Sequence, residues 1–139
     1  MEKLSKEDFT IRVHSKEDLP FIYSTWLKCF RHSSTFAKEI SNDIYYKYHQ
    51  MVIDRILNRG ATIYVACDKL SPETVFGYIL GEGDVLHFLY VKKSFRKLGI
   101  GTALLDTYGI PEFISHLTKD SKKLSERYKP KMRYSPYHV

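Results

Sequence analysis

The chain has 139 residues, of which 43% are apolar and 27% are charged. This composition is typical of one compact domain with its own core and excludes an intrinsically disordered chain. Lys and Arg number 22 against 16 Asp and Glu, and the formal charge of +6 favours an anionic partner. No stretch approaches the roughly 18 consecutive apolar residues that a membrane span requires.

The thiols and the N-terminal residues bear on the cellular compartment. Two isolated cysteines, Cys29 and Cys67, exclude a disulfide scaffold and a cysteine-based zinc site. The first eight residues, MEKLSKED, lack the apolar core of a secretory signal. We therefore expect a cytoplasmic protein without membrane contact. We also expect no metal, because no metal-site spacing relates five of the histidines: His14, His32, His49, His116 and His138.

The N-terminal region predicts a strand followed by a helix. Apolar and polar residues alternate over 9–14, which indicates a half-buried strand. Ser15 begins a helix and forms a capping box with Asp18. The apolar stripe of this helix includes Trp26 and Phe30, which we expect to pack against a sheet.

A polar break over 31–35 separates this helix from a second one. Apolar positions recur with helical spacing over 40–56, and Gly60 closes the helix. The tyrosine-rich run 45–48 lies on it and either lines a cleft or forms a helix face with one solvent-exposed edge.

The pattern then changes to a period of two. Three strands over 61–67, 75–80 and 85–91, joined by short turns, predict an antiparallel meander. We expect Cys67 to be a small core residue of the first of these strands rather than a nucleophile.

The C-terminal region predicts a short helix over 102–108, a strand over 112–118, a helix over 119–128 and an extended segment over 131–139. The sequence shows no repeat or linker. We expect a single α/β (α+β) domain over residues 1–139.

The most informative segment is the basic turn after strand 85–91, because it leads into a helix through Arg96-x-x-Gly99-x-Gly101. A helix N-terminus offers unpaired N–H groups and a positive dipole end, and glycines let a ligand approach the backbone closely. The segment therefore predicts a pyrophosphate site. It lacks the third glycine of the dinucleotide fingerprint and the Gly-Lys-Ser/Thr of a P-loop.

The whole string is more specific than its glycines. Residues 89–105, LYVKKSFRKLGIGTALL, closely resemble motif A of the GCN5-related N-acetyltransferases, the GNAT superfamily. The resemblance is strong over 75–108, moderate over 9–74 and weak after residue 110. It implies a mixed, mostly antiparallel central sheet of about six strands flanked by about four helices.

The resemblance also implies an activity. A GNAT enzyme transfers the acetyl group of acetyl-CoA, without a metal, directly to a primary amine of a small molecule or protein. The strand that ends at Val91 would part from the next one, and the opening would admit the pantetheine arm. The cofactor-binding residues that this implies are Leu89, Tyr90, Val91, Arg96, Lys97, Leu98, Gly99, Ile100, Gly101 and Thr102.

The resemblance suggests a candidate general base. Family members often carry a carboxylate near the position of His87, and the ordinary imidazole pKa of about 6.5 suits a base at neutral pH. A period of two would place His87 on one face with Leu89 and Val91. The histidine either accepts the proton of the amine or simply packs in the sheet, and Glu82 and Asp84 acting through water are alternatives.

The candidate general acid is a tyrosine. In the family it follows the fifth strand on a helix, and Ser121-x-x-Leu124-x-x-x-Tyr128 keeps the spacing to that tyrosine. The rest of the family pattern is missing here. Tyr128 is therefore the candidate acid, with Tyr134 and Tyr137 as competitors.

Two other functions stay open at this level. An enzyme of this kind that modifies a nucleobase would use a basic tail, which comprises Lys119, Lys122, Lys123, Arg127, Lys129, Lys131 and Arg133. A CoA-binding module without catalysis is the other alternative. The chain is expected to be a monomer or a homodimer.

Overall fold

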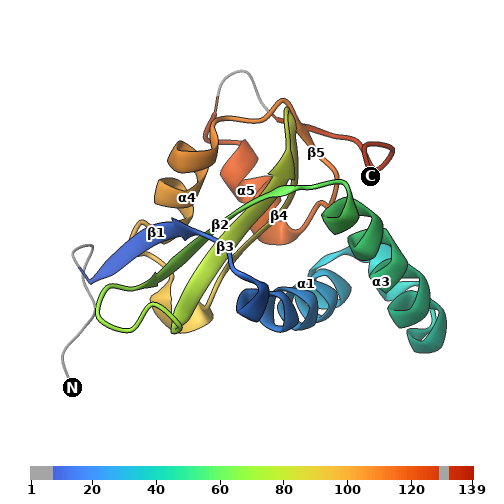
Figure 1. Cartoon of the computed structure of the whole chain (residues 1–139). Helices are drawn as coiled ribbons and strands as arrows, with labels where there is room; N and C mark the ends of the chain where they lie inside the picture. The colour runs from blue at the N-terminus through green and yellow to red at the C-terminus, as the bar shows by residue number, and fades with distance from the viewer. Residues whose placement is uncertain (1–7, 129–131) are drawn as a thin grey trace.

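A computed structural model describes residues 8–128 and 132–139, which form one six-stranded sheet in the order β1-β2-β3-β4-β5-β6 (Figure 1). The first four strands are antiparallel neighbours, whereas β5 runs parallel to β4, and β6 parallel to β5. The bounds are β1 (Phe9–Val13), β2 (Thr62–Asp68), β3 (Val75–Glu82), β4 (Val85–Val91), β5 (Phe113–Ile114) and β6 (Arg133–Tyr134). The predicted mixed α/β sheet and its central meander are confirmed.

Helices cover both faces of the sheet. One face carries α1 (Leu19–Ser33) and α3 (Asn42–Asn58), with the short α2 (Thr35–Lys38) between them (Figure 1). The other face carries α4 (Ile100–Tyr108) and α5 (Lys119–Ser125). Two 3-10 turns, η1 (Lys16–Asp18) and η2 (Lys93–Phe95), precede α1 and α4. None of the helices in the described ranges is long and apolar enough to cross a membrane.

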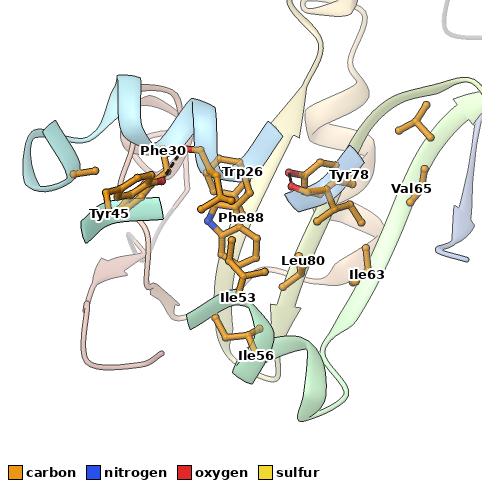
Figure 2. Packing of buried hydrophobic residues seen from close by; sticks show 14 of the residues in the cluster. Trp26, Phe30, Tyr45, Ile53, Ile56, Ile63, Val65, Tyr78, Leu80 and Phe88 are labelled. Carbon is orange, nitrogen blue, oxygen red and sulfur yellow. Dashed lines mark hydrogen bonds between the residues drawn. The ribbon is translucent and has the colours of Figure 1, made fainter. Parts of the chain in front are cut away.

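The core consists of two clusters, one on each face. On the α1/α3 face, Trp26 stacks on Phe88 with ring centroids 5.4 Å apart, and the Tyr45 hydroxyl donates to the Leu27 carbonyl at 2.6 Å (Figure 2). Trp26 and Phe30 are buried there, as predicted, and Cys67 is buried in β2. On the opposite face, α4 packs against β2, β3 and β4.

Several predicted boundaries are wrong. The first long helix continues to Ser33, inside the expected break, and the Ser34 hydroxyl caps the short α2 that follows. The last helix ends at Ser125, before Tyr128.

The two C-terminal strands are also shorter than predicted. The strand expected over 112–118 pairs only at Phe113–Ile114, and the extended segment pairs only at Arg133–Tyr134. Lys129 and Lys131, two residues of the predicted basic tail, lie outside the described residues.

Candidate active site

The candidate site begins where β4 leaves β5. Val85 and Leu86 pair with Phe113 and Ile114, and the Ser115 N–H donates to the Leu86 carbonyl at 3.0 Å. Among the described residues, no ladder pair joins β5 to the rest of β4. The edge of β4 from residue 88 onward is therefore open, with main-chain N–H and C=O groups facing the gap.

A β-bulge bends β4 at this point. Leu80 pairs with Phe88 whereas the next residue, Gly81, pairs with Leu86, so His87 is the extra residue. The bulge turns His87 toward the α1/α3 face, where its ring lies 6.3 Å from that of His116. The prediction that His87 shares a face with the next apolar positions of the strand, 89 and 91, is wrong for this reason, since both of those pack on the α4 face.

A cavity of about 630 Å³ occupies the space between the open end of β4, α1, α5 and the start of α4. Nine of the ten residues predicted to bind the cofactor line it, and Leu98 packs instead against the core cluster on the α4 face. α1 contributes a further wall that was not among the predicted residues and comprises Lys28, Cys29, His32 and Ser33.

The residues at the start of α4 have a row of N–H groups without a main-chain acceptor, and all of these residues except Leu98 line the cavity. Lys97 and Gly99 both have positive φ, 71° and 83°, and Gly99 is the N-cap of the helix. Ala103 is the first residue of the helix to find an acceptor, the Gly99 carbonyl at 2.9 Å. Within the described part of the chain, the N–H groups of residues 97–102 have no acceptor. We call these six groups the amide cradle, and such a cradle at a helix N-terminus favours an anion.

Two glycines near the cavity differ in whether protein packing requires a residue without a side chain. A Cβ at Gly77 would lie 2.4 Å from the Tyr90 carbonyl oxygen, so the close approach of β3 and β4 requires glycine. A Cβ at Gly101 would meet nothing nearer than Val91 Cγ2, at 3.9 Å. Protein packing therefore does not require glycine at 101, and a side chain there would occupy the cavity beside the amide cradle.

The charge of the cavity wall also favours an anion. Cations from four segments line it, namely Lys28, Arg96, Lys97, Lys123 and Arg127, and Asp120 is the one carboxylate among the described lining residues. The Arg96 Nε donates to the Val91 carbonyl at 3.1 Å, and its Nη1 lies 3.4 Å from Asp120. Because two residues of the basic tail belong to this wall, part of the tail's charge is explained without a nucleic acid.

Solved structures resemble this fold, although no protein-family model matches the sequence and no curated protein matches it significantly. A protein named as an acetyl transferase from Pyrococcus furiosus is 18% identical, with a TM-score of 0.59, and the match covers 92% of this chain and 80% of that one. Apo YjaB from Escherichia coli is 19% identical, with a TM-score of 0.52 and coverages of 71% and 63%, so this chain spans under two thirds of YjaB. The PaiA N-acetyltransferase from Thermoplasma acidophilum, solved with coenzyme A, is 21% identical, with a TM-score of 0.50 and coverages of 72% and 69%.

The chain has the GNAT fold. At these identities the likeness establishes the fold alone. No group of three or more His, Cys, Asp or Glu residues within the described ranges is arranged to hold a metal ion.

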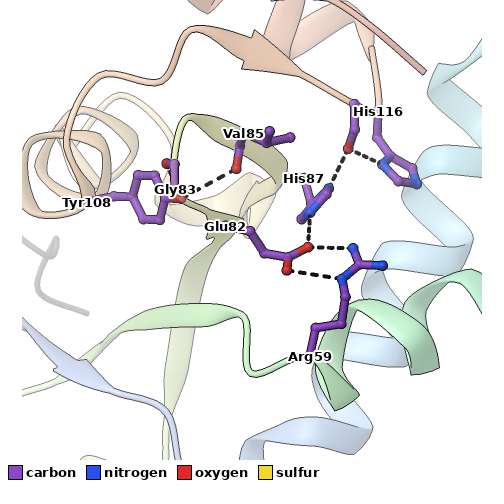
Figure 3. A network of polar contacts seen from close by, with 8 residues as sticks. Arg59, Glu82, Gly83, Val85, His87, Tyr108 and His116 are labelled. Atoms are coloured by element: carbon purple, nitrogen blue, oxygen red, sulfur yellow. Dashed lines mark hydrogen bonds and ion pairs between the residues drawn. The ribbon is translucent and has the colours of Figure 1, made fainter. Parts of the chain in front are cut away.

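The GNAT-fold sheet buries His87 in a polar network rather than in the cavity wall (Figure 3). Its side chain is 1% exposed, with Nδ1 2.6 Å from Ser115 Oγ and Nε2 2.8 Å from Glu82 Oε1. Burial lowers the pKa of His87, and the Glu82 hydrogen bond partly offsets this effect. Both ring nitrogens are engaged, so His87 exchanges protons only through these partners, and its role as a base stays a prediction.

The two alternative bases lie at the same end of the sheet. Glu82 forms a two-bond ion pair with Arg59, at 2.6 and 3.1 Å, which together with the His87 hydrogen bond holds the pKa of the carboxyl below its usual range. Asp84 lies in the turn between β3 and β4. Neither residue lines the cavity.

The three candidate acids lie apart from one another. Tyr128 follows the end of α5, and its half-buried ring packs against the core cluster on the α4 face rather than lining the cavity. Tyr134 lies on β6 and lines a second cavity of about 280 Å³, and Tyr137 is 91% exposed. The assignment of the acid stays a prediction.

Proposed function

We propose that this chain is an acetyl-CoA-dependent N-acetyltransferase. The observation that carries the proposal is the amide cradle of residues 97–102, which opens into a cationic cavity at the point where β4 parts from β5. Coenzyme A carries a diphosphate, a third phosphate and a long neutral arm. The cradle and the cations suit the phosphates, and the open edge of β4 suits the amides of the arm.

In the proposed complex, main-chain groups near Leu89 and Val91 hold the arm and polarise the thioester carbonyl. Fixed N–H donors aimed at an oxygen that gains charge lower the barrier to acyl transfer. The nitrogen of a neutral primary amine forms a bond to the carbonyl carbon, and the bond from that carbon to sulfur breaks. The nitrogen loses one proton and the departing thiolate gains one, so the products are an amide and free CoA thiol. Holding both reactants in one cavity supplies much of the rate. The acceptor is an amine of a small molecule or protein.

A second candidate function is CoA binding without transfer. Its support is the position of His87 and Tyr128, neither of which lines the cavity. The two functions differ in a measurable way. An enzyme releases free thiol from acetyl-CoA when an amine is added, whereas a binding module holds CoA but releases no thiol across a broad panel of amines.

Thermal unfolding with CoA tests the proposal. A ligand at 100 times its Kd adds about 2.7 kcal/mol to the free energy of unfolding, which raises Tm by several degrees. We expect this rise for the wild type and its loss in Arg96→Glu, because that change places a negative charge beside the phosphates. Arg133→Glu is the matched control, since Arg133 is exposed, pairs with Glu112 and does not line the cavity. No rise at millimolar CoA, or equal CoA affinity in Arg96→Glu, would refute the proposed site.

A further inference from the structure

Five polar side chains form one continuous hydrogen-bonded chain through the α1/α3 side of the core. Glu82 Oε1 lies 2.8 Å from His87 Nε2, and His87 Nδ1 lies 2.6 Å from Ser115 Oγ. Ser115 Oγ lies 2.8 Å from His116 Nδ1, and His116 Nε2 lies 2.9 Å from His49 Nε2 on α3 (Figure 3 labels Glu82, His87 and His116). The acetyl-transfer function proposed above assigns a step to none of these five side chains.

The direction of every bond follows from the first one. An ionised carboxylate only accepts, so His87 carries its proton on Nε2 and its Nδ1 accepts the Ser115 hydroxyl proton. The Ser115 oxygen then accepts from His116 Nδ1–H, and His116 Nε2 accepts from His49 Nε2–H. Three neutral imidazoles and one hydroxyl therefore have one consistent arrangement of protons, which leaves Nδ1 of His49 as a lone pair.

The middle members of this hydrogen-bonded chain are buried, and its two end members are partly exposed to solvent. His87, Ser115 and His116 are 1–3% exposed, whereas Glu82 is 27% exposed and pairs with Arg59. His49 is half-buried, and its Nδ1 is neither hydrogen-bonded nor among the fully buried polar atoms of the described residues. Burial lowers the pKa of His87, His116 and His49, the last to about 4, so the rings stay neutral near pH 7, as the single arrangement requires.

Two members of this hydrogen-bonded chain are close in sequence to residues that line the large cavity. His87 precedes Phe88, and His116 comes two residues before Thr118, and both Phe88 and Thr118 line the cavity. Trp26, which stacks on Phe88, also contacts the His116 ring edge-on with centroids 5.1 Å apart. The polar chain therefore adjoins residues of the cavity wall, and none of its five members lines the cavity itself.

We propose that Glu82, His87, Ser115, His116 and His49 form a proton relay between the α3 surface at His49 and the Glu82–Arg59 pair, with one direction of hydrogen bonds in its resting state. This role rests on the proposed acetyl transfer, in which the attacking amine must lose a proton. In the relay, His116, Ser115 and His87 are positioning residues, because each acts through its neighbour.

The proton transfers balance without any other reactant. A proton that binds Nδ1 of His49 displaces Nε2–H to His116 Nε2, and Nδ1–H of His116 passes to Ser115. The Ser115 hydroxyl proton passes to His87 Nδ1, and the His87 Nε2–H passes to Glu82, which becomes a carboxylic acid. The reverse passage returns the proton to the acceptor side, where the departing thiolate takes it, and every ring regains its first tautomer.

Histidine tautomers measured by NMR test the relay independently of any activity. Long-range nitrogen–proton correlation spectra of the ¹⁵N-labelled protein at pH 7 distinguish the two neutral tautomers and the imidazolium. We expect Nε2–H for His87 and His49, and the rarer Nδ1–H for His116. A charged ring, or Nε2–H at His116, would overturn the fixed direction.

Kinetics test the role in transfer. Ser115→Ala removes only the bridging oxygen, and we expect kcat to fall at least tenfold while KM for acetyl-CoA stays unchanged. We also expect a multi-proton solvent isotope effect to become a single-proton one, with recovery in Ser115→Thr. Unchanged kcat and isotope effect in folded Ser115→Ala would refute the relay. The wild type could also show the predicted tautomers and bind CoA but transfer no acetyl group. That result would support the hydrogen-bonded chain and refute its role in transfer.

Discussion

Replacing Gly101 with alanine separates what the fold needs from what the ligand needs. Gly101 is the second residue of α4, and a Cβ there would lie 3.9 Å from the nearest protein atom outside its own helix, Val91 Cγ2. The folded protein therefore has space for the methyl group. Because Gly101 lines the cavity, the same methyl group would occupy space beside the amide cradle, where the diphosphate is proposed to bind.

The two expected effects have opposite signs. Glycine to alanine within a helix stabilises by up to about 0.5–1 kcal/mol, because the unfolded chain loses conformational freedom. For a domain of this size that raises Tm by roughly 1–4 °C. Losing one hydrogen bond to a charged phosphate costs about 1.5–3 kcal/mol, which corresponds to a roughly 10- to 150-fold weaker affinity for CoA.

Two measurements on Gly101→Ala check these effects, namely urea unfolding without ligand and calorimetric titration with CoA. Ala103→Gly is the matched control, because Ala103 lies on the same helix, does not line the cavity and already donates its N–H to the Gly99 carbonyl. We expect the control to lose stability and keep its affinity. A Gly101→Ala variant that binds CoA as tightly as the wild type would refute the proposed role of the amide cradle. A variant that unfolds at a lower urea concentration would refute the conclusion that the fold has space for the methyl group.

Three further predictions concern stability. Gly77→Ala should cost about 1–3 kcal/mol in urea unfolding, because the new Cβ would lie 2.4 Å from the Tyr90 carbonyl oxygen, and a neutral result would contradict this close approach. Trp26→Ala should cost about 3–5 kcal/mol in the same assay, and a loss below 1 kcal/mol would contradict its place in the core. Burial lowers the pKa of His49 to about 4 and also lowers that of His116, so the unfolded chain binds more protons below its ordinary pKa of about 6.5. The free energy of unfolding should therefore fall as pH drops from 6.5 toward 4, by up to about 1.4 kcal/mol per pH unit for fully buried His116, and a flat profile would contradict these shifts.

The sequence predicts best what depends on local pattern. The short apolar runs over 61–67, 75–80 and 85–91 locate the central meander, because helices cover these strands on both faces and short turns leave little choice of pairing. The glycines and cations of 96–102 locate the anion site, since helix N-termini attract anions wherever they occur.

What the sequence could not predict depends on contacts between distant residues. The bulge at His87 arises from the register between β3 and β4, and it moves this side chain to the other face of the sheet. The fifth strand pairs with β4 only at Phe113 and Ile114, and beyond them the Ser115 N–H still donates to the Leu86 carbonyl before the two strands part. His49 and His116 are 67 positions apart, and only the packing of α3 against α1 brings them together. No local sequence pattern marks either histidine as part of a hydrogen-bonded network.

The most direct test of the diphosphate site is a titration of the ¹⁵N-labelled protein with CoA, followed through its backbone amide resonances. Hydrogen bonds to phosphate move amide protons downfield. We expect saturable downfield shifts centred on residues 97–102, and smaller shifts at the open edge of β4 as the arm of the ligand settles there. Saturable binding that leaves the resonances of 97–102 in place, or no shift at millimolar CoA, would contradict the account.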